Sequence, residues 1–171
     1  MSISMFSASV PVCVSMLGNL SHLLDKMQAF IDEKKCDPNA LLHYRMAPDM
    51  LPFTRQILIA CDAAKNGVAR ISGVEAPKFD DTESTVAELK ARIGKTLDFL
   101  KSVSADKLDG TEAKEITFPV GPEAKRTLLG EAYLNRWMMP NMYFHINAAY
   151  MIMRHNGVKV GKSDYLVGAA S

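Results

Sequence analysis

The sequence has few cysteines and no long apolar run. Its three cysteines, Cys13, Cys36 and Cys61, are an odd number without close spacing, so neither a disulfide framework nor a zinc knuckle is indicated. No run approaches the roughly 18 to 20 apolar residues of a membrane span, and the first residues lack the basic start of a signal peptide. We therefore predict a cytoplasmic protein without a membrane partner.

An excess of charge of either sign is also missing. Twenty basic residues face nineteen acidic ones, which gives a formal net charge of +1, and a glycine-rich phosphate loop is absent. A nucleic-acid partner is therefore not expected. Hydrophobic residues make up 48% of the chain, which is enough to fill the core of one domain over residues 1–171.

Apolar residues recur every three or four positions in four long segments, the spacing of one face of a helix. The expected helices run from near the N-terminus to about Glu33, from Asp49 to Gly73, from Thr82 to Val103 and from Tyr133 to His155. Asp49 is expected to cap the second helix and Asp81 or Thr82 the third, because their side chains can accept hydrogen bonds from the first turn.

The segment between the third and fourth helices has a different character. Residues 115–130 contain β-branched and aromatic residues, Pro119, Gly121 and Pro122, which indicates a short two-stranded hairpin. The tail after Gly157 is expected to be irregular. Together these segments predict an all-α four-helix bundle with a β-hairpin insertion.

The last helix places Asn141 and His145 one turn apart on its inward face. Bundles build metal and cofactor sites from inward side chains at this spacing, but asparagine is a poor ligand for zinc or nickel. A hydrogen-bonded pair, a metal site and acid–base chemistry by His145 are all open. The pair is favoured because a buried polar side chain needs a partner.

The second helix offers small residues where a ligand would be wanted. Its inward positions read Ile57, Ala60 and Ala64, and the small residues at 60 and 64 allow a close neighbour or leave room for a bound group. Cys61 is expected to be an inert buried thiol, because no cation that would lower its pKa is near in the sequence.

Four stretches carry a resemblance to a known family, in order and over nearly the whole chain: "MLGNLSHLLDKMQAF", "RMAPDMLPFTRQILIACDAAK", "ELKARIGKTLDFL" and "LNRWMMPNMYFHINAAYMIMRHNGVKVGKSDYL". They resemble the domain of unknown function 1993 family, within the DinB/YfiT-like superfamily. This resemblance implies an up-down-down-up four-helix bundle, often dimeric, in which three histidines bind a divalent metal. Some members are thiol-dependent S-transferases or related hydrolases.

The resemblance also implies where a site would lie. It places the ligand of the second helix near Ala60 and the pair of the fourth helix at Asn141 and His145, so one of the three histidines is present. The expected result is a degenerate metal site and a cavity lined by these three residues.

Three functions follow as hypotheses. The first, which we favour, is a bundle that binds a small molecule without a metal. The second is a metal-dependent transferase or hydrolase with His145 as catalytic residue. Nickel or zinc would be held by His145 and Asn141, and Asp62 or His43 are alternative replacement ligands. The third is a structural or interaction protein that forms a homodimer. The predicted ligand-binding residues are Asn141, His145, Ala60, Ile57, Trp137 and Tyr150.

Overall fold

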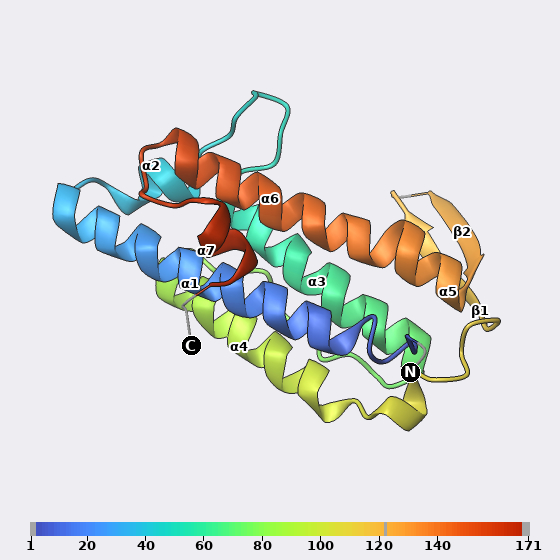
Figure 1. Cartoon of the computed structure of the whole chain (residues 1–171). Coiled ribbons are helices and arrows are strands. Elements are labelled where there is room, and N and C mark those ends of the chain that lie inside the picture. The colour runs from blue at the N-terminus through green and yellow to red at the C-terminus, as the bar shows by residue number, and fades with distance from the viewer. Residues whose placement is uncertain (1–2, 122, 169–171) are drawn as a thin grey trace.

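The protein is mostly helical, with a small antiparallel sheet at one end (Figure 1). The computed structural model describes residues 3–121 and 123–168. Helix α3 packs against α4 and α6, and α1 packs against α4. Helices α3 and α4 run in one direction, whereas α1 and α6 run in the other (Figure 1). The four long helices are α1 (Val10–Lys34), α3 (Phe53–Ser72), α4 (Val86–Ser102) and α6 (Met139–His155).

Helix α1 begins near the N-terminus, as expected from its apolar pattern. Pro11 lies in its first turn, where the missing N–H needs no partner within the helix. The helix ends before Lys35, which has a left-handed backbone with φ of 52°. The short helix α2 (Pro38–Leu42) follows, and the Asp37 carboxylate caps it by accepting from the Asn39 N–H at 2.9 Å.

The N-terminal cap expected for α3 was wrong. The helix begins at Phe53, directly after Pro52, and has no side-chain cap at all. Asp49 lies in the connector before it. At the other end, Gly73 takes the left-handed conformation, with φ of 79°, that commonly stops a helix.

The cap expected for α4 was also wrong, by several residues. Thr85 caps the helix, and its hydroxyl accepts from the Glu88 N–H at 3.2 Å. The Glu88 carboxylate in turn accepts from the Thr85 N–H at 3.0 Å, so two otherwise free N–H groups are satisfied together. Asp81 is instead used in an ion pair with Arg92.

The sheet and a π-helical segment lie between α4 and α6. A single turn of 3₁₀ helix, η1 (Ala105–Lys107), precedes the strands. Strand β1 (Glu115–Val120) pairs antiparallel with β2 (Ala124–Leu129). The short helix α5 (Gly130–Tyr133) then leads through the π segment (Leu134–Met138) into α6 without a break.

The tail is not irregular, which corrects the expectation. Helix α7 (Lys162–Leu166) lies against α1 (Figure 1). The Asn19 amide donates to the Tyr165 carbonyl at 2.9 Å, and Lys26 Nζ lies 2.7 Å from Asp164 Oδ1. Residues 169–171 of the tail lie outside the described residues. Over residues 3–121 and 123–168, no helix has the length and apolarity to cross a membrane.

Candidate functional site

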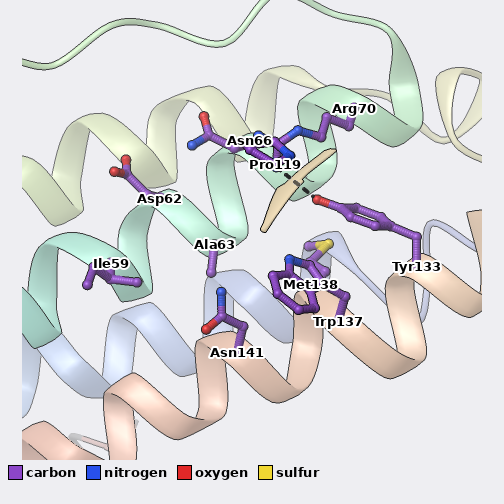
Figure 2. A pocket seen from close by; sticks show the side chains of 10 residues that line it. All are labelled: Ile59, Asp62, Ala63, Asn66, Arg70, Pro119, Tyr133, Trp137, Met138 and Asn141. Carbon is purple, nitrogen blue, oxygen red and sulfur yellow. Dashed lines mark hydrogen bonds between the residues drawn. The ribbon is translucent and has the colours of Figure 1, made fainter. Parts of the chain in front are cut away.

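A cavity of about 160 Å³ lies between α3 and the start of α6 (Figure 2). Helix α3 forms one side, the π segment and α6 form the other, and a residue of β1 borders one end. Three polar residues of α3 follow one another at intervals of four and therefore share a helix face. The lining residues are Ile59, Asp62, Ala63, Asn66, Arg70, Pro119, Tyr133, Trp137, Met138 and Asn141.

A close approach between α3 and the π segment depends on Gly67. A Cβ atom at this position would lie 2.4 Å from Cγ of Met138, which is far inside van der Waals contact. Glycine therefore lets the π segment approach α3 at this level. Pro140, which lacks an N–H, lies in the first turn of α6, two residues after the π segment ends. π-Helical turns of this kind are frequent at functional sites.

Aromatic packing fixes the residues on the α6 side. The ring centroid of Phe118 lies 4.8 Å from that of Tyr133 and 4.9 Å from that of Trp137, both in tilted arrangements. Phe118 and Tyr133 are buried, whereas Trp137 is half-buried. The Tyr133 hydroxyl and the Trp137 indole are thus held in place before any ligand arrives.

Arg70 carries an uncompensated charge at one end of the cavity. Its Nη1 donates to the Tyr133 hydroxyl oxygen at 3.0 Å. Among the described residues, no Asp or Glu forms an ion pair with Arg70. Because a guanidinium has five N–H donors and a phenol is neutral, Arg70 retains both charge and hydrogen-bonding capacity.

Asp62 is held by cations behind the cavity. Its Oδ1 accepts from Arg92 Nη2 at 2.9 Å and lies 3.1 Å from Lys65 Nζ. The buried Arg92 guanidinium also lies 2.9 Å from Asp81 and 3.1 Å from Glu83. These ion pairs fix the Asp62 carboxylate at the rim of the cavity.

Phe79 completes this buried network. Its ring centroid lies 4.2 Å from Lys65 Nζ and 4.3 Å from Cζ of Arg92, so two cations interact with one aromatic ring. The contact pins the crossing segment 73–85 against α3 and α4. The sequence reading missed it, although an arginine three residues after the inward Leu89 was a signal that could have been noticed.

Cys61 lies near the Arg92 guanidinium, which corrects the expectation that no cation acts on this thiol. Burial raises the pKa of Cys61 to about 12 and outweighs the opposing effects of Thr96 and Arg92, which favour the thiolate. The thiol is therefore protonated and unreactive near neutral pH.

His145 pairs with a residue that the sequence reading did not name. Its Nδ1 lies 2.7 Å from Oε1 of Gln56, and Gln56 Nε2 donates to the Leu51 carbonyl at 2.9 Å. Because an amide oxygen can only accept, Nδ1 is the donor in this arrangement. Burial lowers the pKa of His145 and supports the neutral form.

Of the six predicted ligand-binding residues, two line the cavity and four do not. Asn141 and Trp137 line the cavity. Ala60 and Ile57 are fully buried in the core. Their neighbours Ile59 and Ala63 are the residues that reach the cavity.

The other two predicted residues lie further along α6. His145 is one turn beyond Asn141 and is bonded to Gln56. Tyr150 packs against Tyr165 with ring centroids 5.9 Å apart. Of Ala60, Asn141 and His145, which were expected to line one cavity, only Asn141 lines the cavity described above.

The donor set does not fit the three-histidine metal site that the resemblance implied. In the parts of the chain that the structure describes, no three His, Cys, Asp or Glu side chains come together as a metal site would require. His145 uses Nδ1 for an amide. Asn141 offers an amide oxygen, which is a poor ligand for nickel or zinc.

These features define a DinB-like helical protein. A crystal structure of a DinB family member protein from Shewanella denitrificans is similar, with a TM-score of 0.85, 42% sequence identity, and coverage of 94% of this chain and 90% of that chain. The family described as domain of unknown function (DUF1993) matches residues 5–166. The chain therefore belongs to the DUF1993 family. No curated protein matches it.

Proposed function

We propose that the protein binds a small organic molecule in the cavity between α3 and the π segment. The observation that carries this proposal is that uncommitted polar side chains and apolar side chains converge on one cavity. Within the described residues, the side chains of Asn66, Trp137 and Asn141 line the cavity and form no hydrogen bond with another residue. Small-molecule sites commonly combine apolar walls with a few such groups.

The size of the cavity limits the ligand. Its volume of about 160 Å³ is close to the roughly 150 Å³ of a cavity that accepts benzene. Sites for drug-sized ligands are larger, about 300 to 1,000 Å³. We therefore expect a ligand of about six to ten non-hydrogen atoms, or one such part of a larger molecule that extends into solvent.

Trp137 makes a direct test possible, because it is the one tryptophan of the chain. A library of fragments of this size should contain members that shift the indole N–H resonance of Trp137 and change its fluorescence. The variant Ala63→Leu, which fills the cavity, should lose this binding. Ala91→Leu on the exposed face of α4 is the matched control and should keep it. Equal binding by Ala63→Leu, or no response to any fragment, would refute the proposal.

A second candidate function is homodimer formation through the outer face of α6. Tyr143, Phe144 and Met151 are exposed on this helix, and Phe144 keeps 61% of its surface accessible. Single exposed apolar residues are ordinary, but a group of large ones on one helix is typical of an interaction surface.

The solution mass tests this second candidate. Light scattering should give a mass near twice 18.8 kDa, and Phe144→Glu should give the monomer mass. Leu129→Glu, at an exposed apolar residue of β2, is the control and should leave the dimer intact. A monomer in the unmodified protein would exclude this function.

We also infer that the four long helices form the up-down-down-up bundle implied by the resemblance. The shared direction of α3 and α4, opposite to that of α1 and α6, supports this arrangement (Figure 1). The packing of α3 against α6 positions the two sides of the proposed ligand site.

A further inference from the structure

We propose that the cavity selects small organic anions and that Arg70 binds their carboxylate. This inference rests on the proposed function and adds the charge class of the ligand. It follows from the balance of charges around the cavity and from the geometry of Arg70.

The acidic residue at the cavity rim belongs to a group whose charges cancel. Three carboxylates and three cations are joined by ion pairs into a single network, so their formal charges cancel. Asp62 is therefore compensated from behind by Arg92 and Lys65, with separations of 2.9 Å and 3.1 Å. The members of this network are Arg55, Asp62, Lys65, Asp81, Glu83 and Arg92.

Arg70 lies outside this network and supplies the remaining formal charge of the cavity lining. Asp62 also lines the cavity, but its two cationic partners weaken both its repulsion of an anion and its attraction for a cation. An anionic ligand would therefore gain from Arg70, whereas a cationic ligand would be repelled by it. The balance of charge therefore favours an anion over an amine.

Tyr133 prepares Arg70 for this role. The buried Tyr133 hydroxyl accepts from one guanidinium nitrogen at 3.0 Å, which fixes the direction of the planar group and leaves other N–H donors free. A guanidinium held in this way suits a carboxylate, which can accept two parallel hydrogen bonds. Tyr133 is thus a positioning residue that acts through Arg70.

The remainder of the lining indicates an organic rather than an inorganic anion. Ala63, Met138 and Trp137 present apolar surface to the same space, and Asn141 extends from α6 toward Ala63 (Figure 2). Apolar walls contribute nothing to binding phosphate or sulfate, but they stabilise a hydrocarbon body attached to a carboxylate.

Three probes of nearly equal shape test the charge class: benzoate, benzamide and benzylammonium. Their dissociation constants are measured on the whole protein from the Trp137 indole resonance, at neutral pH and low ionic strength. We expect benzoate to bind at least about tenfold more tightly than benzamide, because a charge-assisted pair is stronger than a neutral hydrogen bond. Benzylammonium should bind most weakly.

Variants of Arg70 connect this preference to one residue. Arg70→Met should remove the preference for benzoate and leave benzamide binding unchanged, and Arg70→Gln is a second variant that keeps a polar side chain. Tyr133→Phe should weaken benzoate several-fold without affecting benzamide, which a loss of packing alone would not produce. Arg136→Met, at an exposed arginine of the π segment that does not line the cavity, is the control. A thermal unfolding curve confirms that each variant is folded.

The outcomes separate the two proposals. If benzamide binds as tightly as benzoate, or if both Arg70 variants keep the preference, the anion inference is wrong while the small-molecule site stands. If the fragment library and all three probes leave the Trp137 resonance unchanged, both the proposed function and this inference are wrong.

Discussion

At the residue scale, the pairing of His145 with Gln56 explains why a histidine can lie in an apolar helix. The amide of Gln56 satisfies the ring and is itself anchored to the Leu51 carbonyl. The sequence predicted that His145 would have a hydrogen-bonded partner, because a buried imidazole needs one. It could not identify Gln56, because the contact joins α3 to α6 and such pairings leave no local pattern.

The neutral state of His145 predicts a dependence of stability on pH. Burial lowers the pKa of His145 below its usual 6.5, so the unfolded chain binds more protons than the folded one as the pH falls below that value. The free energy of unfolding should therefore be highest above about pH 6.5 and decrease on acidification toward the folded-state pKa.

Urea unfolding at about pH 7.5 and about pH 5.5 measures this effect. His145→Gln should show a smaller loss of stability between the two pH values than the unmodified protein. His155, which is exposed on the last turn of α6, provides the control variant His155→Gln. An identical pH dependence in all three proteins would contradict the role assigned to His145.

A second prediction at this scale concerns metal content. Because Asn141 is a poor metal ligand, Ala60 has no donor atom in its side chain and His145 is bonded to Gln56, protein purified without chelators should carry less than stoichiometric nickel, zinc, iron or manganese. Elemental analysis by plasma mass spectrometry, beside His145→Ala, measures this. Near-stoichiometric metal that disappears in the variant would revive the metal-dependent transferase.

At the scale of elements, apolar periodicity predicted the long helices but not their starts. Asp81 looks like a cap for α4, yet it is paired with Arg92 and Arg55, and Thr85 caps the helix with Glu88. Helix α7 was missed because five residues are too few to show a helical period. Tertiary contacts thus determined the start of α4 and the position of α7, which local sequence patterns could not predict.

The contact between α3 and the π segment gives a prediction at this scale. Gly67→Ala should destabilise the protein by about 1–3 kcal/mol, because the new methyl group would overlap the Met138 side chain. Gly94→Ala on α4, which has open space around it, should stabilise it by about 0.5–1 kcal/mol through helix propensity.

Denaturant unfolding measures both substitutions. Shortening the opposing side chain in the double variant Gly67→Ala with Met138→Ala should recover part of the loss, because the two positions are in contact. Strictly additive effects of the two substitutions would show that the close approach does not determine the stability of this region.

At the scale of the whole molecule, the Arg92 network joins three parts of the chain. Arg92 on α4 contacts Asp62 on α3 and both Asp81 and Glu83 in the crossing segment. The network also supports Asp62 at the cavity rim, so the candidate site depends on a segment that does not line it. Sequence reasoning could not assemble these residues, because their proximity exists only after the helices have packed.

Removing the central cation tests how much the molecule depends on this network. Arg92→Met keeps an apolar side chain of similar length but leaves three carboxylates without their shared partner, which should cost about 3–5 kcal/mol of unfolding free energy. Lys90→Met removes a half-buried lysine of the same helix that pairs with the exposed Asp25, and should cost less than about 1 kcal/mol. Denaturant unfolding measures both losses, and limited proteolysis should cut residues 73–85 faster in the Arg92 variant alone. Equal losses for the two variants would mean that the crossing segment is held by its packing rather than by charge.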